Sequence, residues 1–268
     1  MSGPDLLIER ENNWETELGA WFPGDTVIMR GLDLFDDLGH MDWVEMWYYS
    51  VTGRFFTKKQ IELFSRIWVT CTSYPEPRIW NNRVATLAAT TRSTAMLALA
   101  SAIAVSEGRI YGGQANIGSV DFITRAKRRV IDEGEKLEDF LKSEVRRLRQ
   151  IPYGYGRPVI NGDERVPRVL KLAEELGFDD GEHVRLALRV EQALNKLRYR
   201  AKINIGGLTA ALLADQGISP KEFYYQAGVI YSAGMMSCYT DAVKKPAGTF
   251  FPLRCESIEY SGAEPRKW

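Results

Sequence analysis

The stretch LEDFLKSEVRRL, residues 137–148, indicates the fold class of this chain because its apolar side chains recur at helical spacing. One face of the expected helix is apolar and consists of Leu137, Phe140, Leu141, Val145 and Leu148. The opposite face is charged and contains Glu138, Asp139, Lys142, Arg146 and Arg147. Such a pattern is typical of a helix that packs one side against a core. We predict that this helix covers residues 119–149, approximately, and that Pro152 ends it.

Helical patterns recur along most of the chain, whereas strand patterns are few. Residues 85–105 are rich in alanine and leucine and carry almost no charge, so the helix expected there must be buried in a multi-helix core. Ser219 directly before Pro220 is a typical helix start. Further helices are predicted over residues 43–51, 58–70, 166–176, 181–197, 208–216 and 220–239. The predicted fold class is therefore mainly α.

The composition of the 268 residues, 45% hydrophobic and 26% charged, is that of a globular protein with a large core. The 35 basic and 35 acidic side chains balance, whereas a nucleic-acid-binding surface needs clustered positive charge. No apolar run approaches the roughly 20 residues of a membrane span, and residues 1–13 do not resemble a secretion signal. We therefore expect a soluble, cytoplasmic protein without nucleic-acid or membrane partners. With only two histidines, a three-histidine metal site is excluded, and we expect no metal.

Four irregular stretches between the predicted helices combine glycine or proline with tyrosine, arginine or asparagine. Glycine lets the backbone approach a ligand closely, and the polar side chains beside it supply hydrogen-bond donors or charge. Taken singly, each of these stretches is better explained as a tight turn or as close helix packing. Several of them on one helical scaffold indicate a pocket. The stretches are SYPEPR (73–78), YGGQAN (111–116), PYGYGRP (152–158) and NIGG (204–207).

Five segments are similar, in the same order, to sequence motifs of one protein family. They are VIMRGLDL (27–34) followed by SVTGR (50–54), YGGQAN (111–116), GYGR with DER (154–157 and 163–165), KINIG (202–206) and EYSG (259–262). They resemble the motifs RGYDI with LLxGxLP, HGGAN, GFGHRVYKxxDPR, PNVDFYSG and LYVG of the citrate synthase superfamily. The resemblance runs over residues 27–268 and is to the short citryl-CoA-lyase-like members in particular.

The resemblance implies a mainly α-helical, citrate-synthase-like fold with a large and a small domain. The large domain would be discontinuous, with residues 1–80 and 206–268, and the small domain would contain residues 81–205. Members of the family join the methyl group of an acyl-CoA to a keto acid, or cleave the corresponding hydroxyacyl-CoA. The resemblance therefore implies a coenzyme A thioester and a keto acid as ligands, no metal, and a homodimer or a hetero-oligomer with a paralogue.

The side chains that usually carry this chemistry are replaced. In the family an aspartate removes the α-proton, one histidine stabilises the thioester enolate, and another polarises the keto group. Tyr111 occupies the position of the HGGAN histidine, and Arg157 occupies that of the GFGHR histidine, which helps to hold the keto acid. Gly206 stands where the aspartate of the NVD motif is expected.

Glu76 falls at the first catalytic histidine when residues are counted back from Tyr111 without gaps, and a short shift places Tyr74 or Ser73 there. These residue types are chemically adequate for a rebuilt catalytic set. Glu76 would be the base if burial raises its pKa, and Tyr111 would donate to an oxyanion. Arg157 would hold a carboxylate with a charge that is fixed at every accessible pH.

Some of the expected binding surface is retained. Arg165 matches the DPR arginine, and Arg254 lies close to a C-terminal arginine that contacts the acid substrate in the family. Both suit a carboxylate because the guanidinium can hold it with two hydrogen bonds. Asn204, in the NVD-like turn, is a further expected substrate contact. A basic run is expected near the CoA phosphates, with a solvated helix end as the equal alternative, and it consists of Arg198, Arg200 and Lys202.

Two functions follow from this sequence. The first is an enzyme that forms or cleaves a carbon–carbon bond in a CoA thioester with an altered catalytic set. The second is a catalytically inactive homologue that serves as a binding or regulatory subunit, because all three usual catalytic side chains are replaced.

Overall fold

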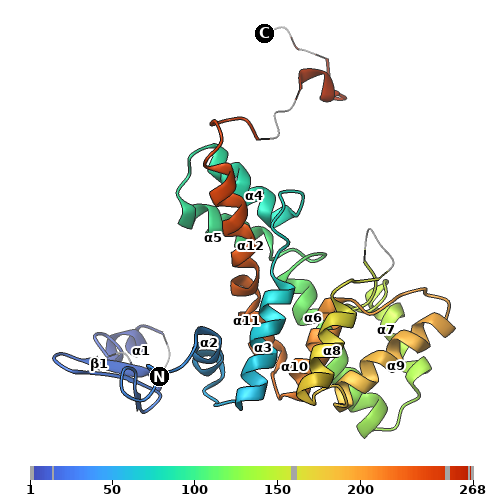
Figure 1. Ribbon diagram of the computed structural model, residues 1–268, viewed down its shortest axis with the longest axis horizontal. Coiled ribbons are helices and arrows are strands. Elements are labelled where there is room, and N and C mark those ends of the chain that lie inside the picture. Colours follow the sequence, from blue (N-terminus) through green and yellow to red (C-terminus); the bar gives the residue numbers. More distant parts are fainter. Residues whose placement is uncertain (1–2, 14, 158–161, 251–253, 265, 267–268) are drawn as a thin grey trace. The chain divides into compact units, whose positions relative to one another are not determined.

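The structure is a computed structural model that describes residues 3–13, 15–157, 162–250, 254–264 and 266 (Figure 1). Its chain divides into two compact units, Met1–Glu62 and Leu63–Trp268. The mainly α-helical fold class is confirmed, since helices dominate and the strands form one small sheet. The predicted discontinuous large domain and inserted small domain stay a prediction. None of the helices in the described ranges is long and apolar enough to cross a membrane.

The first unit combines a small antiparallel sheet with two helices. Arg30 joins the sheet to the second helix, because its guanidinium donates to the carbonyl oxygen of Ser50 at 3.2 Å. That helix begins where Asp42 accepts a hydrogen bond from the backbone N–H of Glu45 and ends at Gly53 with a φ of 68°, close to the range predicted for it. The elements are α1 (Pro4–Glu9), β1 (Gly19–Phe22), β2 (Thr26–Met29), β3 (Leu32–Asp33) and α2 (Trp43–Thr52), with sheet order β1-β2-β3.

The second unit is helical and contains two cores. In one core α4, α5 and α12 pack around Ala85, Ala102 and Met235. In the other, α6, α7, α9 and α10 meet, and the buried rings of Phe122 and Phe140 lie 5.8 Å apart. Its elements are α4 (Trp80–Thr90), α5 (Ala95–Val105), α6 (Gly113–Ala126), the π-helical η1 (Lys127–Asp132), α7 (Leu137–Leu148), α8 (Val166–Leu176), α9 (Glu182–Lys196), α10 (Ile205–Asp215), α11 (Pro220–Tyr225), α12 (Ala227–Ala242) and η2 (Cys255–Ser257). Helix α3 (Lys58–Cys71) spans the division between the units.

The single helix predicted over residues 119–149 is wrong in its length. Helix α6 ends at Ala126 and continues as η1, and Gly134, with a φ of 74°, separates η1 from α7. A residue with positive φ cannot continue a right-handed helix. The apolar face quoted from residues 137–148 does pack inward, since Leu137, Phe140 and Leu141 are buried.

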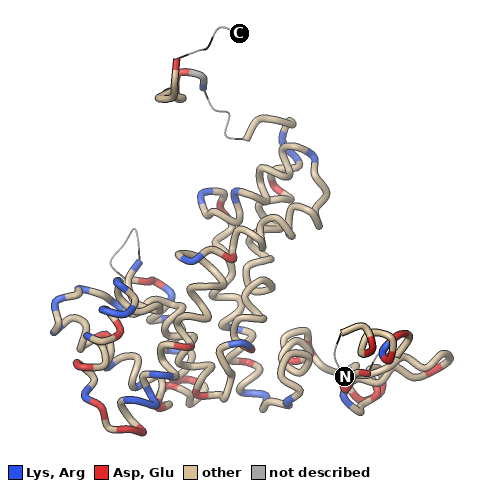
Figure 2. The backbone as a smooth tube through the Cα atoms, turned by 180° about the vertical axis from the view of Figure 1, so that it is seen from behind, with Lys and Arg blue, Asp and Glu red and all other residues tan. Residues whose placement is uncertain are grey.

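The helix predicted over residues 85–105 is in fact two helices. Arg92 has a φ of 62° between α4 and α5, and its guanidinium donates to the carbonyl oxygens of Val243 and Lys245 at 2.8 and 2.6 Å. The expected full burial is also wrong, because 65% of Met96 and 63% of Leu97 are exposed in this chain. Helix α5 contains no Lys, Arg, Asp or Glu (Figure 2). Helix α5 therefore presents an apolar face.

The helix start at Ser219 is confirmed. Its side chain accepts a hydrogen bond from the backbone of Glu222, and the carboxylate of Glu222 accepts one from the backbone of Ser219. The helix predicted over residues 220–239 is two helices, however, because the chain leaves the helical path at Gln226. The side-chain oxygen of Gln226 accepts a hydrogen bond from the indole of Trp68 at 2.9 Å.

Candidate functional site

The four irregular stretches quoted from the sequence line one cavity of the second unit, with a volume of about 690 Å³. Ser73 and Tyr74 come from the first stretch, and Tyr111 and Asn116 come from the second. The loop 150–157 and residues 204–206 form further parts of the wall, together with residues of α3, α10, α11 and α12. Segments that are distant in sequence therefore meet at a single candidate site, as the pocket hypothesis requires.

Two of these stretches are held together by their backbones. The N–H of Asn204 donates to the carbonyl oxygen of Gly154 at 2.9 Å, and the N–H of Gly156 donates to that of Lys202 at 2.7 Å. The side chain of Asn204 donates to the carbonyl oxygen of Gly156 at 2.9 Å and also caps α10. Gly154 has a φ of 91°, and a Cβ added to Gly207 would lie 2.3 Å from the Gly154 oxygen. Glycine is therefore required at this contact.

Arg165 is held by a buried carboxylate at the cavity wall. Its Nε and Nη2 each donate to Asp163 at 2.8 Å, and the Asp163 side chain is only 1% exposed. Burial alone would raise the pKa of Asp163, but the hydrogen bonds from Arg165 and from the backbone N–H of Ile205 outweigh it, so this pKa lies below its ordinary value. The Arg165 guanidinium also lies 5.2 Å from the centre of the Tyr74 ring.

Arg157 lies beside this pair in the same wall. It donates to Glu164 at 2.7 Å and to the carbonyl oxygen of Gly162 at 3.3 Å. Glu164 also accepts a short hydrogen bond from the Tyr74 hydroxyl. Burial and this bond to Glu164 raise the pKa of Tyr74 to about 12. Among the described residues that line the cavity, one is acidic and four are basic, so the lining carries a net positive charge: Asp163, Arg109, Arg157, Arg165 and Arg200.

Tyr111 belongs to an aromatic and amide cluster on another side of the cavity. Its ring is nearly parallel to that of Tyr231, with 6.4 Å between centres, and its hydroxyl donates to Asn81 Oδ1 at 3.4 Å. Asn81 is fully buried, and its Nδ2 donates to Ser73 and Ser106 at 2.8 and 3.1 Å. Asn81 therefore links the loop 73–78 to the turn that carries Tyr111. Burial raises the pKa of Tyr111, so its phenol stays protonated at neutral pH.

The structure brings five of the nine site residues predicted from the sequence to this cavity. They are Tyr111, Arg157, Arg165, Asn204 and Arg200. Glu76 is not among the lining residues, and its carboxylate lies 2.5 Å from Nε of Arg78. The alternatives Ser73 and Tyr74 do line the cavity. Arg198, Lys202 and Arg254 are exposed and outside the lining, and the roles predicted for them stay predictions.

Sequence reasoning missed two members of the cluster around Tyr111. Asn81 is in the first turn of α4, and Tyr231 is in α12. Neither lies in a glycine-rich stretch, and nothing in the local pattern separates them from ordinary helix positions. Their link to Tyr111 arises only when α4 and α12 pack together. Asp163 belongs to the DER motif, but the motif does not indicate that Asp163 is the buried partner of Arg165.

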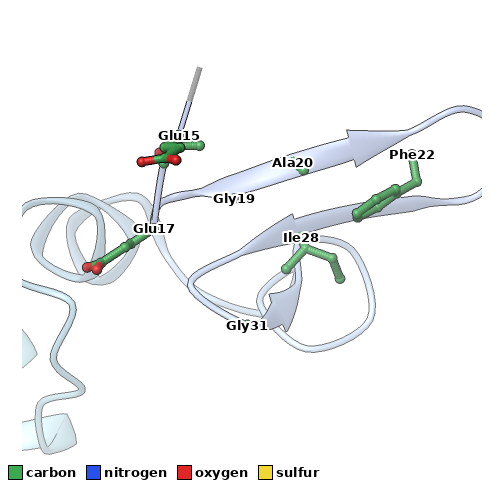
Figure 3. A pocket seen from close by; sticks show the side chains of 8 residues that line it. Glu15, Glu17, Gly19, Ala20, Phe22, Ile28 and Gly31 are labelled. Atoms are coloured by element: carbon green, nitrogen blue, oxygen red, sulfur yellow. The ribbon is translucent and has the colours of Figure 1, made fainter. Parts of the chain in front are cut away.

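Two other hollows lack these features. The hairpin of the first unit forms an open hollow of about 540 Å³, and Figure 3 shows Phe22 and Ile28 on its strands and Glu15 and Glu17 on the segment before β1. None of the described residues that line this hollow is basic, so they do not favour an anionic ligand. A second cavity, of about 310 Å³, lies between α4 and α12, and its charged residues, Asp241 and Lys245, pair with each other at 2.6 Å.

Neither His40 nor His183 is among the residues that line the cavity. Nδ1 of His183 is 2.8 Å from Asp215, and Asp215 also accepts hydrogen bonds from the backbone N–H groups of His183 and Val184. His183 thus belongs to the start of α9, and His40 is an exposed residue of the first unit. Within the described ranges no group of three or more His, Cys, Asp or Glu side chains is arranged to hold a metal ion.

The chain belongs to the citrate synthase family, since the family model of the citrate synthase C-terminal domain matches residues 36–242. Its fold is similar to that of citryl-CoA lyase from Hydrogenobacter thermophilus, with a TM-score of 0.82, 20% identity, and coverage of 96% of this chain and 97% of that one. A search of curated proteins by sequence found no match.

Larger proteins contain the same fold. ATP citrate lyase from Methanothrix soehngenii, solved in complex with citrate and coenzyme A, is 16% identical, with a TM-score of 0.75. The similarity covers 98% of this chain and 45% of that one. Citrate synthase from Thermoplasma acidophilum, solved with carboxymethyl coenzyme A and oxaloacetate, is 17% identical, with a TM-score of 0.64. The similarity covers 85% of this chain and 58% of that one.

Proposed function

We propose that this protein binds a coenzyme A thioester and a keto acid in the 690 Å³ cavity, and that it forms or cleaves a carbon–carbon bond between them. The observation that carries the proposal is the positive lining of a cavity built by the family's motif segments. Both ligands are anions, and arginine binds carboxylate and phosphate groups with paired hydrogen bonds. The citrate synthase structure, with a coenzyme A derivative and oxaloacetate, supports this pair, and the ATP citrate lyase structure, with coenzyme A and citrate, supports a coenzyme A and an acid site.

Individual roles follow from the positions in the wall. Arg157, Arg165 and Asn204 would hold the carboxylates of the keto acid. Tyr111 would exchange its 3.4 Å hydrogen bond to Asn81 for one to the oxygen that becomes negatively charged. Arg200 would contact the phosphates of coenzyme A, and its exposed neighbours Arg198 and Lys202 would add charge at the entrance. Arg254, which is exposed, keeps only the acid-binding role proposed from the sequence.

Glu76 is the proposed base, but its contacts show what that role requires. The carboxylate is paired with Arg78 outside the cavity, so the loop 73–78 has to rearrange when a ligand binds. In the enzyme, Glu76→Gln and Tyr111→Phe should each abolish exchange of the α-protons of bound acetyl-CoA with solvent, measured by mass spectrometry in deuterium oxide. Unchanged exchange in a variant would remove that residue's assignment.

The acid-binding role is tested through Arg157→Met. We expect calorimetric titration to show that oxaloacetate binds at least about tenfold more weakly, because a charge-assisted bond contributes roughly 1.5–3 kcal/mol. The affinity for coenzyme A should stay within a factor of about two. Arg168→Met, which changes an exposed arginine of α8, is the matched control. Equal affinity of parent and Arg157→Met for the keto acid would contradict the role.

One observation favours the second function, a catalytically inactive binding or regulatory subunit. Asp163 is the only carboxylate among the described lining residues, it is occupied by Arg165, and no histidine lines the cavity. Under this function the parent protein binds coenzyme A or acetyl-CoA but exchanges no α-protons. Binding of neither would favour a protein that acts only through other chains, such as a paralogue.

The apolar face of α5 supports a homodimer. Met96 and Leu97 are largely exposed there, and Trp80 and Leu87 of α4 are 48% and 40% exposed. Large exposed apolar patches commonly mark interfaces, and soluble oligomers are mostly symmetric copies of one chain. Sedimentation analysis should show a dimer that Leu97→Glu converts to a monomer, whereas Lys171→Glu on α8 should leave it intact. A monomeric parent protein would overturn this proposal.

A further inference from the structure

Tyr231 places an orientated phenol in the cavity. It belongs to α12 and lines the cavity, and its hydroxyl oxygen accepts a hydrogen bond from Nδ2 of Asn116 at 2.6 Å. Among the described residues it has no other hydrogen-bond partner. Because the oxygen is already an acceptor, the hydroxyl hydrogen is available to an acceptor outside the protein.

Asn116 presents its amide nitrogen to the Tyr231 hydroxyl. Its amide nitrogen contacts Tyr231, and its Oδ1 faces Gly206, where an added Cβ would lie 3.5 Å from that oxygen. Asn116 also sits in the first turn of α6, and its backbone N–H donates to the carbonyl oxygen of Gly112 at 3.0 Å. In this arrangement the Asn116 amide donates to the Tyr231 oxygen, which leaves the phenol hydrogen for another acceptor.

The surroundings keep the phenol protonated and place it next to a second donor. Burial is the main cause that raises the pKa of Tyr231 above its ordinary value, and the negative charge that Tyr111 would carry if ionised adds to it. The two tyrosine rings are stacked at 22°. Two neutral phenols thus line the same part of the cavity, and the positive charge of Arg165 acts on both.

We propose that Tyr231 is a second hydrogen-bond donor to the thioester carbonyl oxygen, beside Tyr111, and that Asn116 orientates it. The inference rests on the proposed function, since it requires that a CoA thioester occupies the cavity. Donors aimed at the oxygen on which charge develops stabilise the enolate in either direction of the reaction. Tyr231 is thus assigned as a catalytic residue, and Asn116 as a positioning residue.

The decisive test compares two ligands that differ in one oxygen. Acetyl-CoA carries the thioester carbonyl, whereas S-ethyl-CoA, a thioether, lacks it. Calorimetry should show that the parent protein binds acetyl-CoA more tightly, and each of the two hydrogen bonds should contribute about 2- to 12-fold to this preference. In Tyr231→Phe this preference should be reduced, while the affinity for S-ethyl-CoA stays the same. Tyr225→Phe, which changes an exposed tyrosine of α11, should retain the full preference.

The possible outcomes separate this inference from the proposed function. If the parent protein binds neither ligand, the proposed function fails and the inference fails with it. If the parent binds both and Tyr231→Phe retains the preference for acetyl-CoA, the inference alone is overturned. Equal losses of affinity for both ligands would also overturn it, because they indicate a structural role.

A second variant tests the role of Asn116 while keeping Tyr231. Asn116→Asp retains the shape of the side chain but replaces the amide donor by a carboxylate that accepts the phenol hydrogen. It should therefore reduce the preference for acetyl-CoA as Tyr231→Phe does. In a parent protein that exchanges α-protons, both variants should lower the exchange rate by roughly 100- to 1000-fold. A preference that survives in Asn116→Asp would overturn its positioning role.

Discussion

Arg165→Met is expected to lower the free energy of unfolding by about 3–5 kcal/mol at neutral pH. The reason is that Asp163 would keep its charge at a position where only 1% of its side chain is exposed, without the two hydrogen bonds from the guanidinium. Asp163 would keep two weaker partners. They are the backbone N–H of Ile205 and the guanidinium of Arg157, whose Nη1 lies 3.8 Å from Asp163 Oδ1. Urea denaturation followed by circular dichroism measures the difference.

The pH dependence of this loss gives it a specific signature. In the parent protein the pKa of Asp163 is lowered, so its stabilising contribution is present above the unfolded-state value, about 3.8, and is lost as the pH falls through the folded-state pKa. In Arg165→Met, burial raises the pKa of Asp163 instead, so the deficit should shrink as the pH falls from 7 towards about 4.

A double variant separates the buried charge from the lost packing. Asp163→Asn combined with Arg165→Met removes both charges and should recover most of the stability lost in the single variant. If the double variant is as unstable as Arg165→Met at pH 7, or if the deficit does not change with pH, the buried charge is not the cause.

Gly207→Ala is expected to destabilise the protein by about 1–3 kcal/mol and to weaken ligand binding. Its Cβ would lie 2.3 Å from the carbonyl oxygen of Gly154, so the two loops that form this part of the wall must separate. The separation would break the bonds that join Asn204 to Gly154 and Gly156, and would move the adjoining Arg157. Thermal unfolding and calorimetric titration with oxaloacetate measure both effects.

The adjacent glycine provides a matched control. In Gly206→Ala the nearest atom to the new Cβ is Oδ1 of Asn204 at 3.2 Å, a contact that a small shift relieves. Alanine is also preferred to glycine in a helix by roughly 1 kcal/mol, so the net change in stability should stay within about 1 kcal/mol of zero. Equal losses in the two variants would show that the contact with Gly154 is not the origin of the effect.

The segments that line the cavity could be predicted from the sequence, but the partners of their residues could not. Glycine beside tyrosine and arginine indicated the loops that carry Tyr111, Arg157 and Asn204, because such residues serve ligands better than they serve a core. Glu76, which was also proposed from the sequence, does not line the cavity. Its position in a motif count predicted a base, whereas the orientation of the loop 73–78 pairs it with Arg78.

Helix ends likewise differ in whether neighbouring residues or distant residues determine them. The start at Ser219 depends on residues within one turn, so the local sequence was sufficient to predict it. The division of residues 85–105 into α4 and α5 depends on Arg92, whose positive φ is held by the carbonyl groups of Val243 and Lys245. Those partners are about 150 residues away in sequence, so the residues around Arg92 do not predict them.

The sequence by itself determined the helical class, the family and the loops of the site, because periodicity and motifs are properties of neighbouring residues. Only the tertiary structure decided which side chains share the cavity. Asn81, Asp163 and Tyr231 come from separate segments, and they meet the predicted residues because buried polar groups must find partners wherever the packed helices bring them. The site thus depends on long-range packing that a pattern of neighbours does not contain.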